Sequence, residues 1–359
     1  MFDYKHYVPL LKAKEGEFGA LSELTEGVKN QISPLMDIFP DSETPLDKRL
    51  AKIAKRIGTI WGCDRPIFVD QFGIKLKERV LGKEHPLSFI FDQLRTLNVK
   101  DIPTTGFDRD KAYYNAIENI VKTDNRGICI RLLIDDMENT DELYDNLESL
   151  LSNLDIPYKA AHLILDFREL KVDQVGTAIE TAINAMRKIP HINDWCTLTV
   201  AASGFPGSIR EINTHSSGKL PRTDYLLWTS LINRKQEIER LPSFGDYGIQ
   251  HPDLLELDWK SITLVSNIRY TLPDVWLIIK GGSNKKYGWH QSHKLSKELV
   301  NMPEYYGKTL SWGDNYISLC SEETVGPGNP TIWRKVGTNH HITLVSKQIA
   351  NVDVLYSFV

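Results

Sequence analysis

The chain has 359 residues, of which 41% are hydrophobic and 25% are charged, and its formal net charge is -4. The composition is typical of a globular protein. The small negative charge argues against a protein that coats nucleic acid through a broad basic surface, although it leaves room for a local basic groove. No run approaches the roughly 18 apolar residues of a membrane span, and the charged start MFDYKHY is unlike a secretory signal. We therefore expect a cytoplasmic protein without membrane contact.

Short apolar runs alternate with stretches of helical periodicity along the first 250 or so residues. The expected strands, in chain order, are 7–13, 32–38, 66–72, 100–107, 128–136, 162–167, 196–204 and 242–249. Eight strand–helix alternations in this length predict an α/β fold, a closed (β/α)₈ TIM-type barrel over residues 1–255. The alternative is an open doubly wound sheet, because the run 100–107 is weakly marked and strand order is invisible in a sequence.

The last part of the chain, residues 256–359, has a different pattern. The stretch 266–282 predicts a β-hairpin with Leu-Pro-Asp at its turn, and the stretch 290–300 predicts a helix. We expect an α+β, β-rich C-terminal cap packed on the barrel. If it is inserted between the eighth strand and a closing helix, it leaves the barrel at the catalytic end.

Charged residues gather where the predicted barrel strands end. In (β/α)₈ enzymes this end, called the barrel mouth below, carries the active site. The side chains expected there are Lys12, Asp37, Asp70, Arg131, Asp135, Asp136, Asp166, Arg168, Asp246 and Tyr247.

Two interpretations of the charged mouth stay open. The charges form either an ion-pair network that closes the barrel end or a polar cavity. In the second case the carboxylates bind a divalent cation such as Mg²⁺ or Mn²⁺, or act as acid and base, and the cations and Tyr247 bind an anion. The expected catalytic residues are Asp37, Asp70, Asp166 and Asp246, and the expected ligand-binding residues are Lys12, Arg131, Arg168 and Tyr247.

The stretch AASGFPGSI, residues 201–209, follows the seventh predicted strand. Barrels often bind phosphate with backbone N–H groups of the loops after strands seven and eight. The alternative is a tight connection without a ligand. The residues that would form the phosphate site are Ser203, Gly204, Gly207 and Ser208.

Five stretches are distinctive in combination: YVPLLKAKEGEFGAL, FGDYG, IRYTLPDVWLIIKG, SWGDNYI and GNPTIWRKVGTNHHITLV. Together they resemble the phage "beta protein" family of phages and bacterial genomes, from Tyr7 to about Val345. The resemblance implies a place in mobile elements and a role in phage–host conflict, and it brings no established reaction. The residues to which it draws attention are Lys12, Glu15, Asp246, Tyr247, Tyr270, Lys280, Asp314, Trp333 and His341. Of the adjacent His340 and His341, we expect one in the core and one exposed.

The expected function is that of a component of phage–host conflict, in anti-phage defence. Its barrel mouth would bind a phosphorylated small molecule, a nucleotide or a nucleic-acid end. If the protein is an enzyme, we expect a metal-assisted phosphoester or nucleotide-processing hydrolase. The alternative is a non-enzymatic scaffold or partner-binding subunit of a defence complex, whose protein partner supplies the chemistry.

Overall fold

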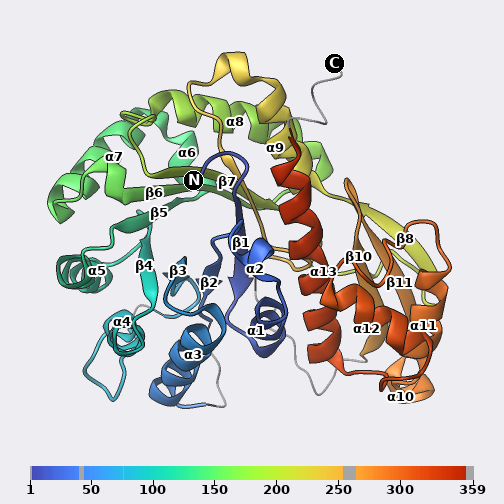
Figure 1. Ribbon diagram of the computed structural model, residues 1–359. Coiled ribbons are helices and arrows are strands. Elements are labelled where there is room, and N and C mark those ends of the chain that lie inside the picture. The colour runs from blue at the N-terminus through green and yellow to red at the C-terminus, as the bar shows by residue number, and fades with distance from the viewer. Residues whose placement is uncertain (1, 40–43, 76, 254–263, 353–359) are drawn as a thin grey trace.

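Eight parallel strands close into a barrel that helices surround (Figure 1). The structure, a computed structural model, describes residues 2–39, 44–75, 77–253 and 264–352. The barrel strands are β1 (Tyr7–Lys12), β2 (Leu35–Asp37), β3 (Pro66–Asp70), β4 (Lys100–Thr105), β5 (Ile128–Leu132), β6 (Ala161–Glu169), β7 (Thr197–Ser203) and β9 (Ser243–Asp246). They pair in this order, and β9 closes the ring on β1. The predicted (β/α)₈ barrel is confirmed, and the open sheet is wrong.

Several of the helices around the barrel follow an apolar stripe in the sequence. In α3, buried Leu50, Ile53 and Ile57 share one face, and α5 begins where the carboxylate of Asp110 accepts the N–H of Tyr113. The helices around the barrel are α1 (Glu15–Ser22), α2 (Glu26–Lys29), α3 (Leu46–Trp61), α4 (Pro86–Thr96), α5 (Lys111–Asp124), α6 (Ile134–Glu138), α7 (Thr140–Leu154), α8 (Val175–Lys188) and α9 (Thr223–Asn233), with 3₁₀ turns η1 (Tyr158–Ala160), η2 (Val172–Gln174) and η3 (Lys235–Glu237).

The fifth strand is shorter than predicted. It ends at Leu132, and Asp135 and Asp136 belong to α6. Asp136 accepts the backbone N–H of Leu133, so it caps this helix. The two aspartates therefore belong to α6 and not to the strand, and a role for them at the barrel mouth stays a prediction.

The barrel interior changes from apolar to polar toward the mouth. Side chains alternate along a strand, so every second residue points inward. One layer is an apolar cluster of Val8, Leu10, Leu35, Phe68, Ile102, Cys129, Ile164 and Ala201, capped by Tyr247. The next inward positions are polar, and they are Lys12, Asp37, Asp70, Thr104, Arg131, Asp166 and Ser203. The strand ends therefore bring charged groups together above a closed apolar floor.

A three-stranded antiparallel sheet lies beside the barrel. Its order is β10 (Val265–Thr271), β11 (Val275–Ser283) and β8 (Ser216–Pro221). The hairpin of β10 and β11 confirms the prediction, whereas β8 was not predicted and comes from the connection between β7 and α9. The expected boundary between residues 255 and 256 lies outside the described residues.

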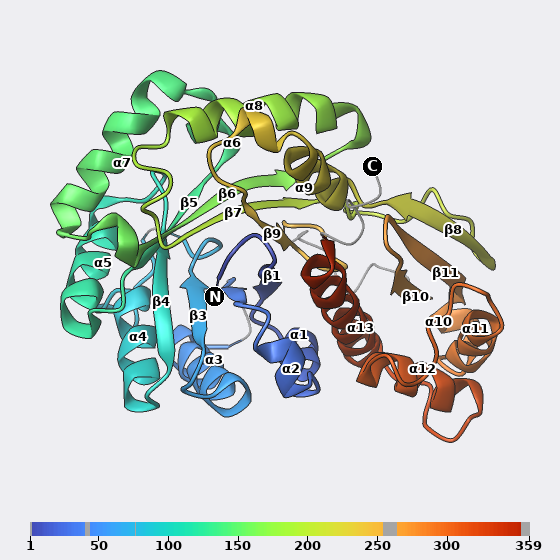
Figure 2. The ribbon, with the colours of Figure 1, turned by 45° about the horizontal axis from the view of Figure 1, so that its top comes forward.

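The C-terminal helices complete the molecule. They are α10 (Asn284–Tyr287), α11 (Gln291–Val300), α12 (Trp312–Ser321) and α13 (Pro330–Ala350). Helix α13 packs on α1 on one side and on β10 and α12 on the other, so it stands between the barrel and the small sheet (Figure 2). At the crossing with α12, a Cβ on Gly313 would lie 2.3 Å from the carbonyl oxygen of Val336, so this approach requires glycine. Helix α13 is the eighth helix of the barrel.

Among the helices that the structure describes, none combines the length and the apolar character that crossing a membrane requires. The cytoplasmic location stays a prediction.

Candidate functional site

The guanidinium of Arg131 lies at the centre of the barrel mouth. It donates hydrogen bonds to Asp37 (2.9 Å), Asp70 (2.8 Å) and Asp166 (2.8 Å). It also donates to the hydroxyl of Tyr247 (2.7 Å), which in turn donates to Asp166 (2.5 Å). We call these five residues the inner cluster. Strands β2, β3, β5 and β6 and the end of β9 each supply one member, so barrel closure alone assembles it.

The inner cluster is almost completely shielded from water, since its members are between 0% and 3% exposed. Burial raises the pKa of Asp37 to about 6, against the opposing effect of Arg131. Burial also opposes the charge on Arg131, but Asp37, Tyr247 and Asp166 raise the pKa of this guanidinium well above its usual value. The cluster therefore holds one permanent cation among three carboxylates.

These carboxylates do not fit a magnesium or manganese site in this arrangement. Each of the three accepts a hydrogen bond from Arg131, so a divalent cation would have to displace the guanidinium from all of them. Among the residues that the structure describes, no group of three or more His, Cys, Asp or Glu is arranged to hold a metal ion. The arrangement suits an ion-pair layer that organises the groups above it.

Two residues that sequence reasoning missed complete this layer. Arg109 donates to both carboxylate oxygens of Asp70 (2.9 and 3.1 Å). Phe72, which is half-buried, places its ring 5.3 Å from the guanidinium of Arg109, 4.6 Å from that of Arg131 and 4.3 Å from that of Arg168. Both residues follow the end of a barrel strand, in the loops after β4 and β3, and this position was the signal that could have identified them.

Lys12 and Arg168 lie at the mouth as predicted, but their partners differ from those of Arg131. The ammonium of Lys12 donates to the backbone oxygens of His251 (2.9 Å) and Asp253 (2.7 Å). Arg168, whose φ is 55°, pairs with the carboxylate of Asp253 and contacts the Tyr247 hydroxyl at 3.4 Å. Both cations therefore hold the segment that follows β9.

Asp246 does not lie with the other three predicted aspartates. It precedes Tyr247, so its side chain points to the opposite face of β9, toward α13. There it accepts hydrogen bonds from Tyr7 (2.5 Å) and from Nε2 of His341 (2.8 Å). Nδ1 of His341 meets the hydroxyl of Thr271 at 2.9 Å, which fits a neutral ring that donates to Asp246.

The surroundings of Asp246 form a second buried cluster, the outer cluster, made of Tyr7, Arg222, Asp224, Asp246 and His341. Burial lowers the pKa of His341, and His341 and Arg222 keep the pKa of Asp246 below its usual value despite burial. Burial raises the pKa of Asp224 to about 7. The Thr271–His341–Asp246 chain resembles a catalytic relay in its order, but each member is at most 1% exposed, so no substrate reaches it here.

The neighbouring His340 is also fully buried, so the expectation that one of the two histidines is exposed is wrong. Its Nδ1 meets a carboxylate oxygen of Asp314 at 2.9 Å, and its Nε2 meets the carbonyl oxygen of Thr271 at 2.9 Å. Both partners are acceptors, an arrangement that suits a protonated ring. Tyr270 donates to the same Asp314 carboxylate (2.7 Å).

Other residues marked by the family resemblance have structural contacts. Glu15 pairs with Lys52 and Arg56 on the surface. Lys280 donates to the carbonyl oxygens of Ile209 (2.9 Å) and Ile212 (2.6 Å), and Trp333 donates to that of Pro327 (2.9 Å).

The loop after β7 is bound tightly to its neighbours. The hydroxyl of Ser203 donates to the carbonyl oxygen of Gln250 (3.0 Å), and a Cβ on Gly204 would lie 2.7 Å from the backbone nitrogen of Thr223. Gly207 is half-buried and Ser208 is exposed. The small residues thus let the chain pass close to α9, and the phosphate site expected at 203–208 stays a prediction.

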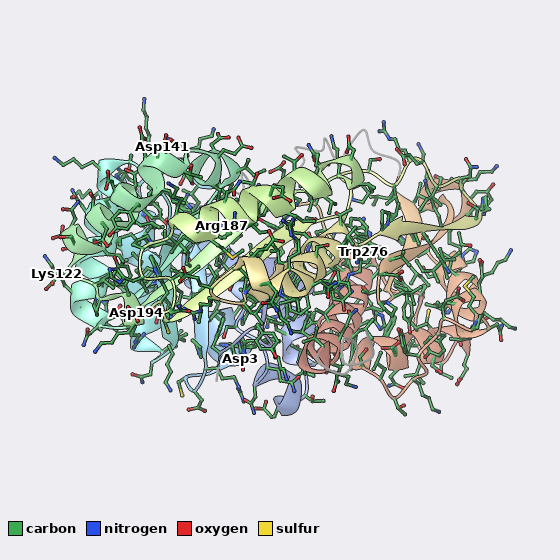
Figure 3. All side chains as sticks on the ribbon, turned by 90° about the horizontal axis from the view of Figure 1, so that it is seen from above. Asp3, Lys122, Asp141, Arg187, Asp194 and Trp276 are labelled. Carbon is green, nitrogen blue, oxygen red and sulfur yellow. The ribbon has the colours of Figure 1, made fainter. Side chains whose placement is uncertain are left out.

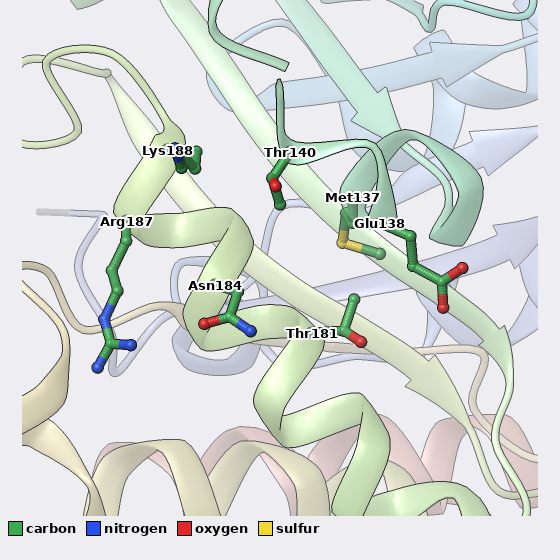
Figure 4. Close-up of a pocket in the computed structure, with 7 residues that line it drawn as sticks. All are labelled: Met137, Glu138, Thr140, Thr181, Asn184, Arg187 and Lys188. Atoms are coloured by element: carbon green, nitrogen blue, oxygen red, sulfur yellow. The ribbon is translucent and has the colours of Figure 1, made fainter. Parts of the chain in front are cut away.

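A surface pocket of about 400 Å³ lies between α6, the start of α7 and α8 (Figure 4). None of the predicted site residues lines it. Its walls are Met137, Glu138, Thr140, Thr181, Asn184, Arg187 and Lys188.

Comparison with known families agrees with the motifs. The family model described as "Beta protein" matches residues 7–347, from β1 to most of α13, and so includes both clusters and the small sheet. No curated protein matches the chain. The chain therefore belongs to the Beta protein family.

Proposed function

We propose that the barrel mouth binds a phosphorylated ligand above the inner cluster, at Lys12 and Arg168. The proposal rests on Arg168, whose ion-pair partner is exposed and could be replaced by a ligand. This guanidinium is anchored by stacking on Phe72, and its carboxylate partner is Asp253, whose side chain is 60% exposed. A phosphate oxygen would take the place of that carboxylate at little cost, because an exposed ion pair contributes about 0–1 kcal/mol.

The charge at the mouth supports the same conclusion. Four cations converge there, namely Lys12, Arg109, Arg131 and Arg168. Their buried carboxylate neighbours are Asp37, Asp70, Asp166 and Glu17, whereas Asp108 and Asp253, which pair with Arg109 and Arg168, are exposed and replaceable. Guanidinium groups match the geometry of phosphate and form two hydrogen bonds with it. The inner cluster then serves as a fixed support for the rim cations.

Binding is the part of the function that the geometry favours. Hydrolysis by Asp37, Asp70 and Asp166 requires the carboxylates to leave Arg131, and Asp246 lies on the other face of β9, so these catalytic roles stay predictions. A role in phage–host conflict, with nucleotides or nucleic-acid ends as the ligand class, is proposed from the resemblance to phage beta proteins.

Isothermal titration calorimetry with inorganic phosphate and tripolyphosphate tests the mouth. We expect Arg168→Gln to lower the affinity about tenfold or more, because it removes hydrogen bonds to a charged group. Asp253→Asn should raise the affinity up to about fivefold, since it removes the competing carboxylate. The control is Lys122→Gln on α5, which Figure 3 shows at the end of the molecule opposite the C-terminal helices. Equal affinity in all four proteins would refute the proposal.

A partner-binding scaffold is the second candidate, and one surface feature favours it. Leu81, in the loop between β3 and α4, is 79% exposed and has a φ of 49°, which is costly for a residue other than glycine. Exposed Lys77 and Lys83 flank it together with Glu78 and Glu84, so charges of both signs surround an apolar tip, which suits a partner with an apolar pocket and a polar rim. Loss of a co-purifying partner in Leu81→Ser, with retention in Lys122→Gln, is the expected result, and retention in both would contradict it.

A further inference from the structure

We propose a second anion subsite beside the mouth, formed by Lys12, Arg269 and Arg334, that takes a second phosphate group of the same ligand. The proposal rests on the phosphate-binding function of the mouth and specifies its ligand as one that carries at least two phosphate groups. Arg269 comes from β10 and Arg334 from the start of α13, so the subsite joins the small sheet to the barrel.

Arg269 is a half-buried cation with neutral partners. Its Nη1 donates to the carbonyl oxygen of Ile249 (2.7 Å), and its Nε donates to the side-chain oxygen of Asn267 (3.3 Å). The guanidinium stacks 4.6 Å from the ring centre of Phe205. Within the described part of the chain no carboxylate forms an ion pair with Arg269, so its charge is balanced by neutral acceptors alone.

The guanidinium of Arg334 also has unused hydrogen-bonding capacity. Its Nη1 is 3.9 Å from a carboxylate oxygen of Glu17, and it has no hydrogen-bond partner among the described protein atoms. Glu17 is shared, because it also accepts a hydrogen bond from the side chain of Gln250. The stem of Arg334 is held against Gly16, where a Cβ would lie 2.5 Å from its Cγ, while 30% of the side chain remains exposed.

Consecutive residues of one segment bring these cations together. Arg269 contacts residue 249, Glu17 contacts Gln250, Lys12 contacts residues 251 and 253, and Arg168 contacts Asp253. The segment 249–253 therefore runs from the proposed subsite to the mouth. A ligand that lies along it meets Arg334 and Arg269 at one end and Arg168 at the other, with Lys12 between them.

Mutual repulsion of these cations is consistent with an anion site. Burial lowers the pKa of Lys12 to about 8 and that of Arg269 to about 9. For both residues the positive charge of Arg334 is the second-largest cause of the lowered pKa. Burial lowers the pKa of Arg334 as well. A bound phosphate group would relieve this repulsion, which is how cationic sites favour anions over water.

Two measurements on the full chain test the subsite. In calorimetry, wild-type protein should bind tripolyphosphate about tenfold or more tighter than orthophosphate, because the second contact is intramolecular. Arg334→Gln should remove most of that difference, Arg334→Lys should retain part of it, and Lys122→Gln should leave it unchanged. In crystals soaked with tungstate, one peak is expected at Arg168 and a second at Arg269 and Arg334.

The outcomes separate the two proposals. A peak at Arg168 alone, with an unchanged tripolyphosphate advantage in Arg334→Gln, overturns the subsite and supports the mouth. A peak at Arg334 alone, with full binding in Arg168→Gln, overturns the mouth and supports an independent anion site. If neither peak forms and no variant changes binding, both proposals are overturned.

Discussion

Strand β9 separates two buried polar clusters that differ in how completely their groups are paired. On its inner face Tyr247 joins Arg131 and three carboxylates in a network in which each carboxylate accepts from Arg131. On its outer face Asp246 is well bonded, but both carboxylate oxygens of Asp224 and the Nε and Nη2 of Arg222 lack hydrogen-bond partners among the described protein atoms. The closest approach of Arg222 to either aspartate is 3.8 Å.

The difference indicates how each cluster responds to loss of a group. A fully paired network fails when one member is removed, because the remaining charges are left buried and alone. A partly paired network loses less when a group is removed, because fewer hydrogen bonds depend on that group. We therefore expect the inner cluster to be intolerant of substitution and the outer cluster to contain one position whose removal is harmless.

The largest effect is expected from Arg131→Met. It leaves Asp37 and Asp166 buried without their cation and Asp70 with Arg109 alone, and it should lower the free energy of unfolding by about 3–5 kcal/mol. Burial already raises the folded-state pKa of Asp37 to about 6, and loss of the opposing Arg131 raises it further, so the contribution of Asp37 to stability is present at low pH and lost as pH rises. Urea denaturation should thus show a smaller loss at pH 5 than at pH 8. A pH-independent loss below about 1 kcal/mol would contradict the central role of Arg131.

A smaller loss is expected from Asp246→Asn, about 2–3 kcal/mol at neutral pH, because it weakens the bonds to Tyr7 and His341. The pKa of Asp246 is below its usual value in the folded protein, so its contribution is present above about pH 4 and lost as pH falls. The stability of wild type and variant should converge in acid denaturation. Parallel curves down to pH 2 would show that the carboxylate is not the stabilising form.

Asp224→Asn should raise the free energy of unfolding, whereas the two substitutions above lower it. With a pKa raised to about 7 by burial, Asp224 favours the folded state below its unfolded pKa and loses that contribution as pH rises through 7. Relative to wild type, the variant should gain at least about 1 kcal/mol in unfolding free energy between pH 4 and pH 8, the equivalent of one pKa unit. A loss of stability at pH 8 would mean that Arg222 depends on this charge.

The smallest effect is expected from Arg168→Gln, about 0–1 kcal/mol, because its partner Asp253 is exposed. Thermal unfolding in phosphate-free buffer measures it. Arg131→Met removes the same charge at the same mouth. A large loss of stability in that variant and a small one in Arg168→Gln would show that Arg131 stabilises the fold and that Arg168 is free to bind a ligand. A loss above about 2 kcal/mol would place Arg168 in the structural layer.

The barrel was predictable because its strands are short apolar runs at regular spacing. Strand β8 was not, since Ser-Ser-Gly-Lys-Leu-Pro has no apolar alternation and forms the edge of its sheet. The burial of both His340 and His341 could not be predicted from the sequence for another reason. Helix α13 is covered on two sides, by the barrel and by the small sheet, so it lacks the single apolar stripe that reveals a buried face.

The members of the inner cluster could be predicted from the positions of the strand ends alone. The structure does bring together Asp37, Asp70, Asp166, Arg131 and Tyr247. Asp246 was placed with them although Tyr247 is its neighbour, and alternation allows only one of the two to face inward. Arg222 was missed because its partners come from β9, from the turn between β10 and β11 and from α13, which are distant in sequence. Asp224 was missed with it, since Arg222 is its ion-pair partner.

The position of α13 in the chain affects how the protein is made. The helix that covers α1 and supplies the partner of Asp246 is translated only after the whole small sheet. Until it leaves the ribosome, the nascent barrel exposes an apolar flank, and long-range closures of this kind fold slowly and aggregate readily. A chain truncated before Pro330 should therefore depend on chaperones and be degraded quickly, even though it carries all eight barrel strands.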